Sequence, residues 1–206
     1  MTMQPDDAVA EATALVQMHQ PGEALDILED ALPLAQDHEQ LLNLRAWLLF
    51  ELQRPEQAVI AIRDILERWP ESVSARLLFA QHLLDRNQPA EALVSIDTAL
   101  AVDEGAVGAY RLRSTAQAQL GLWAEAHESA VEGVRLDPEN ADALVQLAGL
   151  KLTGGNLTDA EQLALHALRV DPENSGAHRL LDAIANPPRP RLFGRRRRRP
   201  DSGTGG

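Results

Sequence analysis

The tetrapeptide DPEN occupies residues 137–140 and recurs unchanged at residues 171–174, 34 positions later. Two earlier steps of the same length reach DEGA at 103–106 and WPES at 69–72, where only part of the sequence is kept. A fixed interval of this size predicts an array of repeated structural units. Cutting the chain at this interval needs no insertion or deletion and gives five units, at residues 5–38, 39–72, 73–106, 107–140 and 141–174.

The second half of each unit opens on a similar sequence: PGEA (21–24), PEQA (55–58), PAEA (89–92), WAEA (123–126) and LTDA (157–160). Proline is favoured at the first position of an α-helix, where its missing N–H would have no partner anyway. The acidic or amide residue two positions later can reach back toward the free N–H groups of the first turn. Apolar residues then recur at helical spacing, as at Ile62, Ile65 and Leu66, so this half is predicted to be a helix.

The first half of each unit carries an apolar stripe as well, and a short turn separates the two predicted helices. Three units have Asn87, Gly121 and Gly155 at the turn, residues that tolerate the left-handed conformation in which many helices end. His19 and Gln53, which tolerate it less well, hold the same position in the other two units. Each unit is therefore predicted to be a helix–turn–helix.

The DPEN sequence marks the boundary between one unit and the next. Pro138 and Pro172 are expected to end the second helix, because proline cannot continue it. Asn140 and Asn174 are expected to cap the helix that follows, and Ser72 can do the same at the equivalent point.

Alanine recurs at two positions of the units, and both positions have a packing reason. Small side chains let two helices approach closely, and a larger side chain there would overpack the contact by about 1–3 kcal/mol. One helical hairpin buries little by itself, whereas stacked hairpins share a continuous core. The alanines predicted to lie at these contacts are Ala12, Ala24, Ala46, Ala58, Ala80, Ala92, Ala126, Ala148 and Ala160.

With this period, these turns, the paired alanines and the DP-x-N ending, residues 5–174 resemble the tetratricopeptide repeat family. The resemblance implies an all-α, right-handed solenoid in residues 5–186, with five helix–turn–helix units and a capping helix at 175–186. It also implies that the first helices line the concave face and the second helices form the convex face. A plain helical bundle is the competing interpretation, and the unbroken 34-residue period argues against it.

The chain departs from the family pattern at two positions of the first helix. Ala8 and Arg76 stand where a large apolar residue is usual, and Glu11, Arg45 and Arg113 stand where leucine is usual. Looser helix packing, or long side chains whose charged ends reach outward to solvent, would account for these residues.

Composition and charge narrow the class of protein. The chain has no cysteine, no signal-like N-terminus and no apolar run long enough for a membrane-spanning helix, so we expect a cytoplasmic protein. Arginine outnumbers lysine 18 to 1, a bias typical of high-GC bacterial genomes. The net charge of −12 divides into −18 for residues 1–186 (30 acidic, 12 basic) and +6 for residues 187–206 (seven Arg, one Asp).

The sequence predicts no catalytic, metal or cofactor site. It contains no dinucleotide-binding glycine motif, phosphate loop, HExxH motif or nucleophile elbow. Its six histidines never pair at helical spacing, and His82 and His166 are better explained as surface or partly buried residues of helices. The expectation is a protein that is not an enzyme.

The concave face implied by the family is the candidate binding site. Trp47, Phe50 and Leu77 would form an apolar anchor there, and Asn43 and Gln81 would offer amides to the backbone of a peptide or helix. Trp47 has a second interpretation, as core packing between helices. The candidate groove residues are Asn43, Trp47, Phe50, Leu77, Gln81, Arg111, Thr115 and Gln146.

The two-carboxylate clamp that some members of the family use for C-terminal carboxylates is absent. The places that would supply it hold Val9, Thr13, Leu44, Ser74 and Leu78. The expected partner is therefore a protein or peptide of another kind, and such arrays also self-associate through their terminal units.

Residues 187–206, PPRPRLFGRRRRRPDSGTGG, are predicted to be disordered because four prolines, four glycines and a run of arginines cannot form a packed core. Four interpretations stay open: weak binding of nucleic acid, binding of anionic lipid, folding back onto the acidic body, or a solubilising terminus. The arginines that would contact an anion are Arg195, Arg196, Arg197, Arg198 and Arg199.

Overall fold

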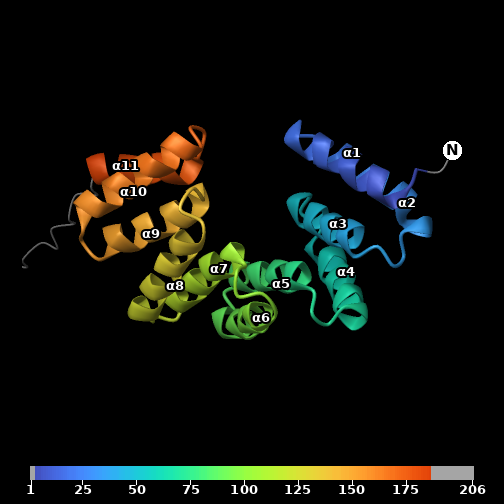
Figure 1. Ribbon diagram of the computed structural model, residues 1–206, viewed down its shortest axis with the longest axis horizontal. Coiled ribbons are helices and arrows are strands. Elements are labelled where there is room, and N and C mark those ends of the chain that lie inside the picture. The colour runs from blue at the N-terminus through green and yellow to red at the C-terminus, as the bar shows by residue number, and fades with distance from the viewer. Residues whose placement is uncertain (1–2, 187–206) are drawn as a thin grey trace, which may run out of the picture.

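The computed structural model describes residues 3–186, and this part of the chain is helical without a strand (Figure 1). The predicted tail, with its five consecutive arginines, lies outside the described residues. The α-helices are α1 (Pro5–Gln17), α2 (Pro21–Ala31), α3 (Glu39–Glu51), α4 (Pro55–Arg68), α5 (Val73–Asp85), α6 (Pro89–Val102), α7 (Val107–Gln119), α8 (Trp123–Leu136), α9 (Ala141–Thr153), α10 (Leu157–Val170) and α11 (Ser175–Ala185).

The helices stack in one continuous array. The odd-numbered helices, called first helices below, each contact the next first helix, from α1 to α11. The even-numbered second helices contact the first helices on either side of them, but within residues 3–186 no two second helices pack closely together. The first helices therefore form a closely packed inner layer and the array curves around it, so that α1 and α11 stand at opposite ends of an open arch (Figure 1). This all-helical solenoid confirms the predicted fold class.

The turns inside the units adopt the predicted left-handed conformation in every case. Gly121 and Gly155 have φ angles of 78° and 81°, and the three non-glycine residues at the same position, His19, Gln53 and Asn87, have φ angles of 58–60°. The geometry of the hairpin thus overrides the preference of His19 and Gln53 for negative φ.

The boundaries between units follow the DPEN prediction. The side-chain oxygens of Asn140 and Asn174 each accept a hydrogen bond from the backbone N–H three residues later, both at 3.0 Å, and Ser72 caps α5 at 3.4 Å. In the first unit the Nδ1 atom of His38 caps α3, at 3.2 Å from the N–H of Leu41. Ala106 holds the same place before α7 and makes no side-chain cap.

The acidic residues of the second helices make a different bond from the one predicted. In α2 and α6 the carboxylates of Glu23 and Glu91 accept hydrogen bonds from the side-chain amides of Gln20 and Gln88, at 2.8 and 2.9 Å. The partner is therefore the side-chain amide of the residue before the helix. These bonds still join the turn to the helix that follows.

All nine alanines predicted at the helix contacts are fully buried, which confirms the packing argument. In the fourth unit the column that contains Ala80 and Ala148 holds Ser114 instead, also fully buried. Its hydroxyl lies 3.2 Å from Nε2 of Gln146, so a hydrogen bond joins α7 to α9 at this point.

Two of the departures from the family pattern are explained by ion pairs between units. Arg45 of α3 lies 3.3 Å from the carboxylate of Glu29 in α2, and Arg113 of α7 lies 3.2 Å from that of Asp97 in α6. Both pairs occupy the same position two units apart. Partly exposed pairs contribute about 0–1 kcal/mol each, so they replace an apolar contact without adding much stability.

The second helix of the first unit ends earlier than the equivalent helices. A short 3₁₀ helix, Leu32–Leu34, follows α2 directly. Pro33 explains the change, because its ring and missing N–H do not allow the α-helix to continue. The helix therefore ends at Ala31, and Leu32, at the position that Leu66 holds inside α4, lies in the 3₁₀ turn.

Candidate functional site

Two adjoining cavities lie along the inner faces of α3, α5 and α7, with volumes of about 660 and 430 Å³. Trp47, Glu51, Leu78, Gln81 and Asp85 line both of them, so they form one continuous depression, called the central groove below. The groove crosses three successive units, and its walls are side chains of the first helices almost throughout.

Trp47 stands at the middle of the central groove. Its side chain is half-buried and packs against the core cluster that α1 to α4 share. The same residue borders both cavities. An indole ring placed in this way offers apolar contact area to a ligand and loses little conformational freedom when the ligand binds.

Phe50 lines the smaller cavity and stacks on His82, with ring centroids 5.2 Å apart and an angle of 28° between the rings. Burial lowers the pKa of His82 below its usual value, and the nearby charge of Arg86 lowers it further, against the opposing effects of Asp85 and Glu56. A neutral imidazole suits this place because a stacked ring pair excludes water from one face of each ring.

Asn43 and Gln81 are less free than the sequence suggests. The amide nitrogen of Asn43 donates to the hydroxyl of Ser72 at 3.3 Å, and Gln81 donates to the carboxylate of Asp85 at 2.9 Å. Asn43 is 9% exposed, and its Oδ1 atom has no hydrogen-bond partner among the described residues. A buried acceptor without a partner costs about 1–3 kcal/mol, so this atom lowers the stability of the protein around α3.

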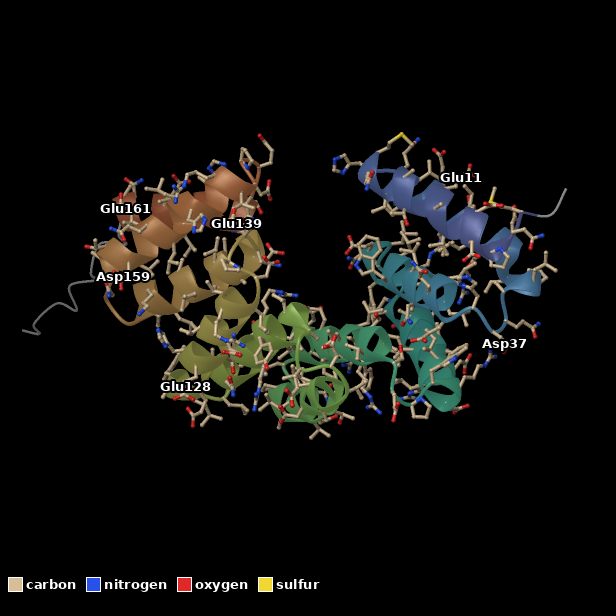
Figure 2. All side chains as sticks on the ribbon, in the orientation of Figure 1. Glu11, Asp37, Glu128, Glu139, Asp159 and Glu161 are labelled. Atoms are coloured by element: carbon tan, nitrogen blue, oxygen red, sulfur yellow. The ribbon has the colours of Figure 1, made fainter. Side chains whose placement is uncertain are left out.

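The central groove carries charges of both signs at different places. Glu51 and Asp85 stand at the ends of α3 and α5, whereas Arg111 lies on α7. Arg111 makes no ion pair with any residue in 3–186, so its guanidinium is available to an acidic group. Several other carboxylates lie around the outside of the arch; Figure 2 labels Glu11, Asp37, Glu128, Asp159 and Glu161 there.

The predicted site residues fall into separate groups. Asn43, Trp47, Leu77, Gln81 and Arg111 line the larger cavity together, and Phe50 lines the smaller one. Thr115 lines neither cavity of the central groove, and its hydroxyl donates to the backbone carbonyl of Arg111 at 3.0 Å. Gln146 lines a different cavity, described below. The predicted anion-binding arginines, 195–199, lie outside the described residues.

Sequence reasoning missed several residues of the central groove. Glu51 and Asp85 follow the predicted Trp47 and Gln81 by four positions, which is one helical turn, so helical spacing carried a signal for them. Gly108 carried no chemical signal, because it has no side chain to contribute.

A second depression, called the C-terminal hollow below, lies on α7, α9 and α11 and has a volume of about 430 Å³. Val145, Leu150 and Leu180 line it, with Trp123 from the start of α8 at one side. Trp123 is 55% exposed. Three of the other four units have proline at its position in the repeat. Arg179 is the charged residue of its lining.

The part of the chain that the structure covers shows neither a metal-binding cluster nor a membrane span. No group of three or more His, Cys, Asp or Glu side chains within residues 3–186 is arranged to hold a metal ion. None of the helices drawn in Figure 1 is long and apolar enough to cross a bilayer.

Comparison with known proteins places this geometry in a family. Two family models, each described as a tetratricopeptide repeat, match the chain, one at residues 9–73 and 77–141 and the other at residues 117–184. No curated protein sequence matches it.

Solved structures with the same fold are similar over most of the chain. A thermophilic TPR protein of Thermus thermophilus has a TM-score of 0.79 at 18% identity, over 88% of this chain and 99% of that one. PilW, a type IV pilus biogenesis factor, has a TM-score of 0.69 at 20% identity, over 88% and 93%. YrrB, a TPR protein with an unusual peptide-binding site, has a TM-score of 0.55 at 18% identity, over 85% and 91%. At these identities the likeness shows the fold.

Proposed function

Because the chain belongs to the tetratricopeptide repeat family, we propose that it is a non-catalytic scaffold or adaptor that binds a peptide or helix of a partner protein in the central groove. The observation that carries the proposal is the position of Trp47, half-buried on the core and bordering two cavities that cross three units. A central aromatic anchor flanked by apolar and polar groups is the usual composition of an energetic hot spot.

The lining of the groove suits a peptide better than a small metabolite. It is open along its length and joins apolar surface at Trp47 and Leu77 to the amide of Gln81 and to charged groups at its edges. A peptide supplies apolar side chains and backbone N–H donors together. The peptide-binding site named for YrrB, which has the same fold, agrees with this proposal.

The proposal is tested by affinity capture from cell extract with wild-type protein and the Trp47→Ala and Phe50→Ala variants. Recovery of a specific partner should fall in both variants. Ile60→Ala is the matched control, because Ile60 is an apolar side chain of α4, 60% exposed and outside the central groove. Circular dichroism of each variant separates lost binding from lost folding. Equal recovery of every partner by all four proteins would remove the groove as the binding site.

A second candidate function rests on the charge of the chain's end. Residues 187–206 carry +6 against −18 for residues 1–186, so a contact with nucleic acid or anionic lipid would form through Arg195–Arg199. Deleting residues 189–199 should then abolish binding to DNA or anionic vesicles at low salt. An absence of such binding by the full-length chain rules this function out.

A further inference from the structure

The C-terminal hollow is a second copy of the central groove, displaced by two units. Subtracting 68, which is twice 34, from the number of any residue that lines the hollow gives a residue that lines the central groove. Val145 corresponds to Leu77, Gly176 to Gly108, and Arg179 to Arg111. The correspondence holds for all the lining residues, so the two depressions share one construction.

Both depressions are bordered by nearly the same short sequence on their last helix, with one residue of five different. Residues 108–112 read GAYRL in α7 and residues 176–180 read GAHRL in α11. At Gly176 the missing side chain is needed for close approach, because a Cβ atom there would lie 2.9 Å from Cγ1 of Val145. A Cβ atom on Gly108 would make an ordinary contact, 3.9 Å from Cδ1 of Leu77. The arginine, nearly one turn later, is then placed beside that apolar side chain.

The two depressions differ in where the aromatic group stands and in their charge. The aromatic wall of the C-terminal hollow is Trp123, at the position that Pro55 holds in the central groove, while Leu150 replaces His82. Thr153 replaces Asp85, so the C-terminal hollow has Arg179 and no carboxylate among the described residues of its lining. The central groove has Arg111 together with Glu51 and Asp85.

We propose that the two depressions bind one partner peptide through two anchors, each an apolar side chain next to a carboxylate. The apolar side chains occupy the spaces beside Leu77 and Val145, which Trp47 and Trp123 border, and the carboxylates meet Arg111 and Arg179. The carboxylates of Glu51 and Asp85 select a basic residue at the end of the peptide that lies over α3. This inference rests on the proposed function, because it takes the central groove to be a peptide site.

The order and spacing of the ligand follow from the array. From α3 toward α11 the groups of the peptide are basic, apolar, acidic, apolar and acidic. Packed helices lie about 8–10 Å apart, so two steps along the first helices separate the anchors by about 16–20 Å. An extended chain advances about 3.3 Å per residue, which sets the two apolar residues about five to six positions apart, and a spacing of six keeps both side chains on one face.

The proposal is tested with synthetic fluorescent peptides and purified full-length protein. One peptide carries a lysine and two Leu-x-Glu segments, whose leucine and glutamate side chains share one face of an extended chain, and its leucines stand about six residues apart. Two other peptides keep only one segment, and a fourth has the leucines about four residues apart. The two-anchor peptide should bind at least about tenfold more tightly than either single-anchor peptide. The Arg111→Gln and Arg179→Gln variants should each lose that advantage, whereas Arg169→Gln, on the exposed surface of α10, should keep it.

The outcomes separate this inference from the proposed function. If two-anchor and single-anchor peptides bind equally well, and Trp47→Ala weakens both, the central groove binds peptide and the two-anchor inference is wrong. If Arg179→Gln has no effect on the two-anchor peptide, the C-terminal hollow is not an anchor site. If neither peptide binds to wild-type protein, the proposed ligand class and the two-anchor inference are both wrong. Capture of a partner that depends on Trp47 would still support the central groove as the binding site.

Discussion

Two glycines of the last unit and the capping helix, Gly149 and Gly176, have different structural roles. Gly176 lies in the first turn of α11, where an added Cβ atom would meet Val145 at 2.9 Å and Oδ1 of Asn174 at 3.2 Å. Gly149 lies in the interior of α9, where an added Cβ atom would meet no atom within 4 Å. The first glycine is needed for close approach of two helices, and the second only lowers the stability of its helix.

We predict opposite effects when each glycine is changed to alanine. Gly149→Ala should stabilise the protein by about 0.5–1 kcal/mol, because it removes backbone entropy from a helix interior without a clash. Gly176→Ala should destabilise it by about 1 kcal/mol, because overpacking against the stiff side chain of Val145 outweighs the gain in helix propensity. Thermal melts of the two variants and of the wild type give the comparison. A rise in melting temperature for Gly176→Ala would show that α11 shifts without cost.

The lowered pKa of His82 predicts a loss of stability in acid. Burial and Arg86 hold the folded-state pKa below the unfolded value of 6.5, so the unfolded state binds more protons between these two values. The free energy of unfolding should therefore fall as the pH drops through 6.5 and level off below the folded-state pKa. When the pH is lowered from 7.5 to 5.5, the melting temperature of the His82→Leu variant should fall less than that of the wild type.

Leucine is a suitable replacement because Leu150 occupies the equivalent position in the fifth unit. Melts between pH 8 and 9 serve as the control, since His82 is neutral in both states there and the two proteins should respond alike. If the melting temperatures of the two proteins fall by the same amount between pH 7.5 and 5.5, the folded state does not lower the pKa of His82.

Single residues also show where sequence reasoning about the site succeeds and where it fails. The inward positions of Trp47, Leu77, Gln81 and Arg111 follow from the repeat period alone, and the structure brings them to one cavity. Thr115 is absent from that cavity, and its hydroxyl donates to the carbonyl one turn earlier in its own helix. Whether a polar side chain bonds to its own helix or faces the groove depends on interatomic distances, and the 34-residue period does not give these distances.

At the scale of helices, the caps explain why the units begin where they do, and one cap is missing. Asn140 and Asn174 have extended backbone angles and accept the N–H three residues on. Ala106 has nearly the same angles, φ −68° and ψ 88°, but no side chain that accepts a hydrogen bond. The backbone before α7 is thus arranged for a cap that the sequence does not supply.

We predict that Ala106→Asn stabilises the protein by about 1 kcal/mol, by giving α7 the cap that α9 and α11 have. Asn140→Ala is the reverse change and should cost about the same. Urea unfolding of both variants, with the slope of the transition checked for constancy, measures the two effects. Unchanged stability in Ala106→Asn would mean that the bond from the N–H of Ala109 to the carbonyl of Ala106, at 2.9 Å, already satisfies that N–H.

Helix ends were largely predictable because proline, the left-handed turn residues and the capping residues act locally. The early end of α2 at Ala31 was missed, although Pro33 is visible in the sequence, because the repeat pattern was extended across it. The ion pairs of Arg45 and Arg113 were missed for another reason: their partners, Glu29 and Asp97, lie 16 positions earlier in the chain on a different helix. Only the packing of one unit on the next brings them together.

At the scale of the whole molecule, stability depends on contacts between neighbours. Within residues 3–186 each first helix packs closely only on its own unit and the adjoining ones, so the two ends of the arch do not support each other (Figure 1). At the C-terminal end, α11 carries His178 and Asp182 at positions where α9 has the buried Leu144 and Ala148. Its outer face is therefore polar, as expected of a terminal helix in an array of this kind.

We predict that damage at the end of the array stays local and that damage at its centre spreads. Gly176→Ala should raise amide hydrogen exchange in α9, α10 and α11 only, because α11 packs closely on no other described helix. Ile96→Ala removes a fully buried side chain from the core of the third unit and should cost about 2–5 kcal/mol. Loss of the third unit leaves about two intact units on each side, and about three are needed for a stable array. Amide hydrogen exchange should therefore rise along the whole chain.

Hydrogen exchange followed by mass spectrometry resolves the individual helices and compares both variants with the wild type under the same conditions. Ile60→Ala, which removes a side chain from the exposed surface of α4, should leave the pattern unchanged. If Gly176→Ala raised exchange as far away as α1, the five units would unfold as one cooperative body. In such a cooperative body, unfolding at the central groove would also unfold the C-terminal hollow. If stability instead depends only on contacts between adjoining units, each depression keeps its own local stability, and the two anchors of a ligand bind independently.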